Sequence, residues 1–138
     1  MKKISIITSK KYLKSKQYDS LIEILNSNDI KYEILNIDEN LDKKITNSNL
    51  IISVGGDGTA LRAMKIAWLS NLPVLNIGSG RIGYLVNSLN DIDFNKILKD
   101  KNVDNIKKRT PIIQNQDENL PAFNAVSYTH LTLPTSHL

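Results

Sequence analysis

One short segment constrains the fold of this chain more than any other. The apolar run Ile51-Ile52-Ser53-Val54 stops at Gly55-Gly56-Asp57-Gly58-Thr59, and a helical pattern of apolar residues begins directly afterwards. This order predicts a buried strand, a tight turn and a helix that starts at Thr59. Because the first backbone N–H groups of a helix have no partner within it, such a turn is suited to bind a phosphate group.

The rest of the chain alternates between strand-like and helix-like patterns. Strands are predicted at 3–8, 30–37, 49–54, 73–77 and 106–113, and helices at 17–27, 59–70 and 91–98. The polar stretch 38–48 is predicted to be a loop with one helical turn. Strands that alternate with helices indicate an α/β fold, a Rossmann-like doubly wound parallel sheet with helices on both faces.

A second glycine-rich cluster follows the predicted strand 73–77. It reads Gly78-Ser79-Gly80-Arg81-Ile82-Gly83-Tyr84-Leu85. In parallel sheets of this class, ligands bind at the carboxyl ends of the strands. Both glycine clusters follow strands, so both are predicted to lie at that edge and to face the same ligand.

Composition narrows the class of protein and of partner. The chain has 138 residues, 41% of them hydrophobic, which is enough for one domain or for one domain and part of another. It has no cysteine, which excludes disulfides and thiolate metal sites. The net charge of +4 suits a phosphate-bearing partner, but the lysines are scattered, so no nucleic acid partner is predicted.

The same composition argues against a membrane partner. No apolar run approaches the length of a transmembrane helix, and the apolar part of the N-terminus is too short for a signal peptide. We therefore expect a cytoplasmic protein.

The aspartate within the first glycine turn needs its own explanation, because phosphates would repel it. Asp57 could act as a general base toward an attacking hydroxyl group, or it could be a ligand for Mg²⁺. Alternatively, Asp57 only caps the following helix, and the glycines make a compact turn. Glycines permit a positive φ and let another group approach the backbone closely.

Several segments resemble the NAD kinase family, whose members phosphorylate the 2′-hydroxyl of the adenosine ribose of NAD. The matching segments, in the family's order, are Val54–Ala63, Pro73–Leu85, Arg109 and Ala122–Asn124. The first motif alone also resembles diacylglycerol, sphingosine and phosphofructo-type kinases, whereas the pair of glycine clusters is more specific. The resemblance implies ATP (or polyphosphate) and NAD as substrates, Mg²⁺ or another divalent cation, and a whole protein that forms a homo-oligomer.

The resemblance also implies roles for individual residues. Asp57 corresponds to the family's catalytic aspartate, the base on the 2′-hydroxyl. The residues expected to bind the nucleotides are Gly55, Gly56, Gly58, Thr59, Arg62, Tyr84 and Asn124. Two of them have alternative interpretations: Arg62 as a solvated helix residue, and Tyr84, which replaces the usual Phe beside adenine, as a core aromatic. No protein ligand for a metal is identified.

The chain departs from the family pattern at two places. The family usually reads Gly-Ile-Asn-Leu-Gly where this chain has Asn76-Ile77-Gly78-Ser79-Gly80, so neither Asn76 nor Gly78 is assigned a ligand role. Ala125 stands where the family has the Glu of an Asn-Glu pair. Two other functions stay open: a lipid or sugar kinase that shares the first loop, and a non-catalytic nucleotide-binding module.

The composition changes abruptly near the C-terminus. Residues 126–138 contain no Lys, Asn, Ile or Asp, although these residues are abundant in the preceding sequence. Val126–Thr135 resembles the translation of a transposase adapter used in sequencing libraries. We therefore expect an α/β nucleotide-binding domain at 1–105, the start of a truncated C-terminal β domain at 106–125, a non-native tail at 126–138, and little or no activity of this fragment.

Overall fold

The computed structural model describes residues 3–39, 43–78, 85–89, 92 and 94. The predicted helix at 91–98, apart from Ile92 and Phe94, lies outside the described residues. So do the predicted strand at 106–113 and the composition change at 126–138.

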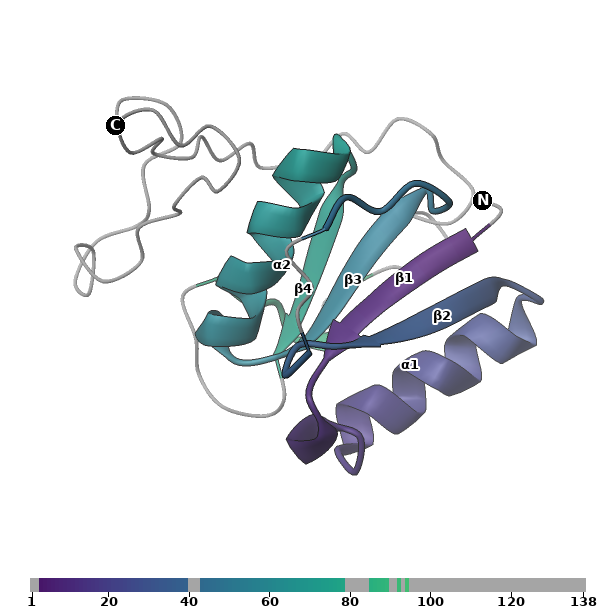
Figure 1. Ribbon diagram of the computed structural model, residues 1–138. Coiled ribbons are helices and arrows are strands. Elements are labelled where there is room, and N and C mark those ends of the chain that lie inside the picture. The colour runs from purple at the N-terminus through teal and green to yellow at the C-terminus, as the bar shows by residue number, and fades with distance from the viewer. Residues whose placement is uncertain (1–2, 40–42, 79–84, 90–91, 93, 95–138) are drawn as a thin grey trace, which may run out of the picture.

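Four parallel strands form one sheet in the order β2-β1-β3-β4 (Figure 1). They are β1 (Lys3–Thr8), β2 (Lys31–Asn36), β3 (Leu50–Gly55) and β4 (Val74–Gly78). The predicted strands in this part of the chain are confirmed, with bounds that differ by one residue at most. The predicted parallel α/β sheet is therefore correct.

Two α-helices and one short 3-10 helix accompany the sheet. They are η1 (Lys10–Tyr12), α1 (Lys16–Ser27) and α2 (Asp57–Ser70). The two α-helices were expected, but α2 begins two residues earlier than the sequence pattern predicted. The helix η1 was not predicted, and the described residues 38–39 and 43–48 contain no helical turn where one was expected.

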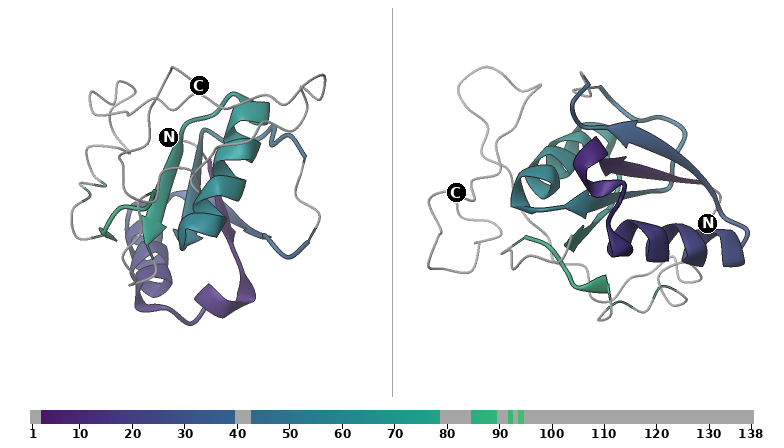
Figure 2. Two further views of the ribbon diagram at one scale, coloured as in Figure 1. Left: turned by 90° about the vertical axis from the view of Figure 1, so that its left-hand side faces the viewer. Right: turned by 90° about the horizontal axis from the view of Figure 1, so that it is seen from below.

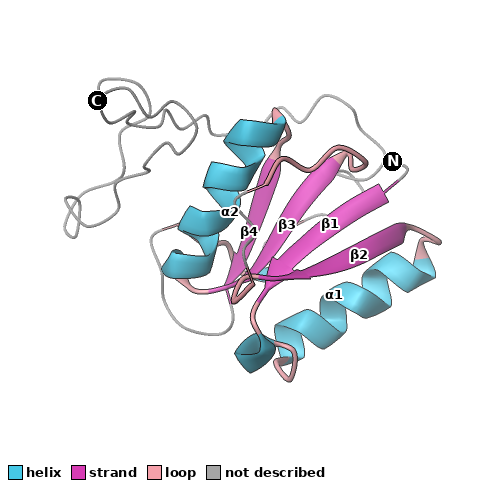
Figure 3. Ribbon diagram, viewed as in Figure 1, coloured by secondary structure: helices cyan, strands magenta, loops and turns pink. Residues whose placement is uncertain are grey.

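The two α-helices cover opposite faces of the sheet (Figures 2 and 3). Alternate residues of β1 separate the two sides, because Ile6 packs in a cluster with Leu21 and Leu25 of α1, whereas Ile7 packs in another cluster with Ile66 of α2. Side chains in a strand alternate between faces, so this division follows from the strand periodicity. Buried on both sides, β1 and β3 are nearly continuous apolar runs, interrupted only by the buried Ser5 and Ser53, as is typical of a parallel sheet.

The order of the strands places a topological switch point between β1 and β3. The chain leaves β1 toward α1 on one face and leaves β3 toward α2 on the other. The chain therefore leaves the two strands in opposite directions at the carboxyl edge, which is the place where ligands bind in doubly wound sheets. The turn Gly55–Asp57 follows β3 at this edge, and η1 follows β1.

Neither helix is long and apolar enough to cross a membrane, a finding that covers only the described residues.

Candidate functional site at the carboxyl edge of the sheet

The predicted turn after β3 is the start of helix α2. Gly55 is the last residue of β3, Gly56 is the N-cap with φ −96° and ψ −165°, and Asp57 is the first helical residue. The interpretation of Asp57 as the helix cap is therefore wrong, because the cap position belongs to a glycine, which offers no side-chain acceptor. Ala60 N–H is the first to bond back along the helix, to Gly56 O at 3.0 Å.

The first turn of α2 has backbone N–H groups that precede its intrahelical hydrogen bonds. The N–H groups of Asp57, Gly58 and Thr59 precede the first intrahelical hydrogen bond, so they have no acceptor within α2. The positive end of the helix dipole lies at the same place. The turn therefore has the donor set and the field that favour an anion.

The glycines of the turn serve different purposes. A Cβ at Gly55 would lie 2.5 Å from Thr59 Oγ1 and 2.9 Å from Tyr12 Cε2, so no side chain fits there. A Cβ at Gly58 would meet nothing within 4 Å. None of Gly55, Gly56 and Gly58 has a φ in the left-handed region, so lack of space, and not positive φ, explains Gly55.

The carboxylate of Asp57 is held by the chain that returns from the second glycine cluster. Leu85 donates its backbone N–H to Asp57 Oδ1 at 3.0 Å, and the Asp57 side chain is half-buried. Leu85 itself is buried in a cluster with Ala60 and Met64 of α2. One carboxylate oxygen is thus fixed by a residue anchored in the hydrophobic core.

The strands that precede the two glycine clusters end at the same edge of the sheet. Gly55 and Gly78 end adjacent strands and are register partners. Residues 79–84, which hold most of the second cluster, lie outside the described residues. The chain returns alongside β4, where Asn87 O accepts from Gly78 N–H at 2.8 Å and Asn76 O accepts from Asn87 N–H at 2.8 Å.

The remaining predicted site residues fall into three groups. Thr59 is buried with its side chain turned toward Gly55, so only its backbone N–H is placed to meet a ligand. Arg62 is half-buried on α2, which does not match the alternative of a freely solvated side chain. Tyr84 and Asn124 lie outside the described residues.

Asn76, to which the sequence assigns no ligand role, forms a hydrogen bond within the sheet. Its buried side chain accepts a hydrogen bond at Oδ1 from Ser53 Oγ at 2.6 Å. This bond joins β3 to β4 beneath α2 and satisfies two polar groups that would otherwise be costly to bury.

One residue beside the turn was missed by the sequence analysis. Tyr12, in η1, brings its ring against Gly55 and its hydroxyl oxygen to 3.7 Å from a Cβ built at Gly56. A signal was present in the sequence, because residues 9–12 follow the first predicted strand and therefore had to lie at the carboxyl edge. It was overlooked because no glycine or acid marks that loop.

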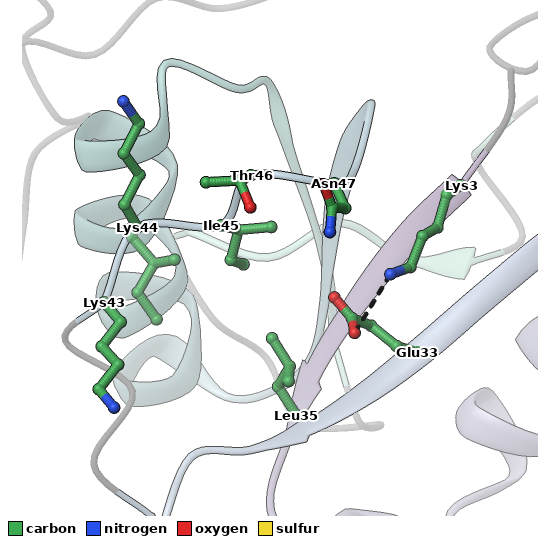
Figure 4. A pocket seen from close by; sticks show the side chains of 9 residues that line it. Lys3, Glu33, Leu35, Lys43, Lys44, Ile45, Thr46 and Asn47 are labelled. Carbon is green, nitrogen blue, oxygen red and sulfur yellow. Dashed lines mark ion pairs between the residues drawn. The ribbon is translucent and has the colours of Figure 1, made fainter.

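A pocket of about 260 Å³ lies elsewhere, on the face of the sheet that α2 covers (Figure 4). Lys3, Leu35 and Ile66 contribute to its walls, together with the 43–47 segment, and Lys3 forms an ion pair of 3.3 Å with Glu33 there. It shares no residue with the Gly55–Thr59 turn.

The fit of a divalent cation depends on Asp57. The described residues contain no group of three or more His, Cys, Asp or Glu side chains that could enclose a metal ion. Mg²⁺ is usually held by one or two carboxylates together with substrate phosphates, so a single carboxylate beside a phosphate site is compatible with it.

The fold and the site together define a doubly wound α/β domain with a glycine-rich, acid-bearing turn at its topological switch point. The family model for the ATP-NAD kinase N-terminal domain matches residues 3–104. The chain belongs to this family.

Individual relatives agree with this assignment. The NAD kinase of Ruminiclostridium cellulolyticum is 34% identical over 116 residues, covering 77% of this chain and 38% of the relative. The NAD kinase of Caldicellulosiruptor bescii is 38% identical over 73 residues, which are 53% of this chain and 27% of the relative. The bifunctional NADP phosphatase/NAD kinase of Methanococcus maripaludis is 36% identical over 90 residues, covering 57% of this chain and 16% of the relative. The chain thus spans well under half the length of these relatives.

Proposed function

We propose that the whole protein to which this chain belongs transfers the terminal phosphoryl group of ATP or polyphosphate to the 2′-hydroxyl of NAD, which gives NADP. The observation that carries the proposal is the placement of one carboxylate, Asp57, between glycines at the start of α2 on the carboxyl edge of the sheet. Membership of the ATP-NAD kinase family supports the choice of acceptor.

In the proposed reaction, the chain's own groups divide the work. The 2′-hydroxyl oxygen forms a bond to the terminal phosphorus, its proton passes to the Asp57 carboxylate, and the bond from that phosphorus to the bridging oxygen breaks. The backbone N–H groups of Asp57, Gly58 and Thr59 hold the donor phosphates. Phosphoryl transfer depends mainly on positioning and charge stabilisation, so one base and a set of fixed donors are sufficient.

The hydrogen bond from Leu85 to Asp57 has a role in this scheme. It fixes the orientation of the Asp57 carboxylate, so that the carboxylate is already positioned before the substrate binds. A divalent cation would be held chiefly by the donor phosphates, because Asp57 acts as the base, and it would supply charge screening for those phosphates.

Asp57→Asn in the full-length protein is the decisive variant for this proposal. We expect its turnover to fall by about 100-fold or more, because an amide of the same shape cannot take a proton. The measurement is NADP formation from ATP and NAD, with circular dichroism to verify the fold. Glu23→Gln, at an exposed position on α1, is the matched control and should keep full turnover.

The outcomes separate the alternatives. Diacylglycerol and fructose 6-phosphate tested as acceptors would reveal a lipid or sugar kinase, and binding of NAD without any transfer would reveal a non-catalytic module. An unchanged rate in Asp57→Asn would remove Asp57 from the mechanism. We also expect the 138-residue chain alone to make little NADP, because it spans 38% of the length of the Ruminiclostridium relative.

A further inference from the structure

The ring of Tyr12 lies against the backbone of the glycine turn. Its Cε2 atom is 2.9 Å from the position that a Cβ would take at Gly55, and its hydroxyl oxygen is 3.7 Å from the corresponding position at Gly56. Thr59 occupies the space on Gly55 at 2.5 Å. The peptide that joins β3 to α2 is therefore enclosed by two side chains, of which Tyr12 comes from a different loop.

Tyr12 is itself fixed by hydrogen bonds on both sides. Its backbone N–H bonds to Ser9 O at 3.0 Å, and its carbonyl oxygen accepts from Ser15 N–H at 3.0 Å and from Ser15 Oγ at 2.7 Å. Ser15 is the N-cap of α1, where its Oγ also accepts from Tyr18 N–H at 3.2 Å. The ring is thus attached to the start of one helix and rests on the start of the other.

The contact lies at the carboxyl edge of the sheet and not in the hydrophobic core. The contact bridges the loops after β1 and β3, the two strands on either side of the topological switch point. Tyr12 is only half-buried, and the Lys11 ammonium nitrogen lies 5.4 Å from the centroid of its ring, within the range of a cation–π contact. A positive charge is therefore held on the ring that touches the turn.

We propose that Tyr12 is a positioning residue for the phosphate-binding turn: its ring holds the Gly55–Gly56 backbone in the conformation that presents the first N–H groups of α2 to the polyphosphate donor. The proposal rests on the proposed function, because it takes the donor to be a polyphosphate. The ring does this by filling the space on one side of the turn. Its hydroxyl group is not required, since no hydrogen bond from it is needed to restrict the backbone.

Affinity for inorganic triphosphate, measured by calorimetry on the 138-residue chain, tests this role. Tyr12→Leu should weaken binding by about 10-fold, which corresponds to about 1.4 kcal/mol. Tyr12→Phe, which keeps the ring, should bind within about 2-fold of the wild type. The matched control is Tyr32→Leu, because Tyr32 is a half-buried tyrosine of β2 that packs on the core beside α1.

A general structural role predicts a different pattern. Tyr32→Leu should lower the thermal midpoint and leave triphosphate affinity unchanged, whereas Tyr12→Leu should lose affinity while the chain remains folded by circular dichroism. If Tyr12→Leu does not fold, Tyr12→His is the variant that tests the proposal. Its affinity for triphosphate should fall by at least about 3-fold. The proposal is wrong if the wild type does not bind triphosphate, if the folded Tyr12 variant binds like the wild type, or if Tyr32→Leu loses as much.

The assay also keeps this inference separate from the proposed function. Triphosphate binding needs neither NAD nor the remainder of the protein. A failure to form NADP in the full-length protein would therefore leave the comparison of Tyr12 variants intact. Conversely, equal triphosphate affinity in all variants would overturn the role of Tyr12 and leave the role of Asp57 standing.

Discussion

Helices α1 and α2 begin at the same edge of the sheet, but their first turns are built differently. At α1, Ser15 is the N-cap, and its Oγ accepts a hydrogen bond from Tyr18 N–H at 3.2 Å. At α2, the N-cap is Gly56, which has no side chain to accept one. At α1 a side chain of the N-cap thus accepts from the first turn, whereas the N-cap of α2 offers no such acceptor, a difference consistent with the phosphate site proposed at α2.

The largest effect on stability is expected from adding a side chain where the turn at the start of α2 is most closely packed. Gly55→Ala places a Cβ within 2.9 Å of Thr59 Oγ1, Thr59 Cβ and Tyr12 Cε2. Overpacking of this kind costs about 1–3 kcal/mol, so the free energy of unfolding should fall by that amount in a urea titration. An unchanged midpoint would mean that the turn tolerates a side chain at this position.

A serine N-cap at α2, like the one that α1 already has, should stabilise the helix and weaken its binding of triphosphate. Gly56→Ser has room, since the nearest atom is the Tyr12 hydroxyl oxygen at 3.7 Å, and the extended backbone at the N-cap suits serine. We expect the free energy of unfolding to rise by about 0.3 kcal/mol. Triphosphate affinity should fall by about 10-fold, because the new Oγ occupies a donor that the phosphate needs.

The matched control removes the cap from the other helix. Ser15→Ala should lower the free energy of unfolding by about 1 kcal/mol. Triphosphate affinity should change by less than about 2-fold, because Ser15 N–H still holds the Tyr12 carbonyl. If both variants changed affinity equally, the two helix starts would not differ as described.

A further test is available at Gly58, which is exposed and faces open space. Alanine is a better helix former than glycine, so Gly58→Ala should stabilise the chain by about 0.5–1 kcal/mol. Its methyl group would enter the space that the phosphates are proposed to occupy and should weaken triphosphate binding measurably by calorimetry. If Gly58→Ala bound triphosphate more tightly, the phosphates would not lie beside Gly58 as proposed.

The fold could be predicted because the sequence signals were local. Nearly continuous apolar runs at Ile4–Ile7 and Leu50–Val54 match strands buried on both faces, and the alternation with helical segments indicated a parallel sheet. The start of α2 was placed two residues too late, at Thr59. Glycine and aspartate are weak helix formers, and tertiary contacts at Gly55 and Asp57 outweigh that propensity.

The site was only partly predictable, for a physical reason. The Gly55–Thr59 turn carries its own chemical signature, whereas the partners of that turn come from other loops. The Leu85 N–H bond to Asp57 joins residues 28 positions apart, and Tyr12 reaches the turn from beyond β1. Neither contact leaves a residue-type pattern in the sequence, because one uses a backbone group and the other uses ring shape.

The most direct test of the central claim is a titration of the ¹⁵N-labelled chain with inorganic triphosphate, followed by NMR. The account predicts that the amide signals of Asp57, Gly58 and Thr59 shift together, while those of Lys16, Gln17 and Tyr18 at the start of α1 remain in place. Equal shifts at both helix starts, or none at α2, would contradict the assignment of the phosphate site to the turn after β3.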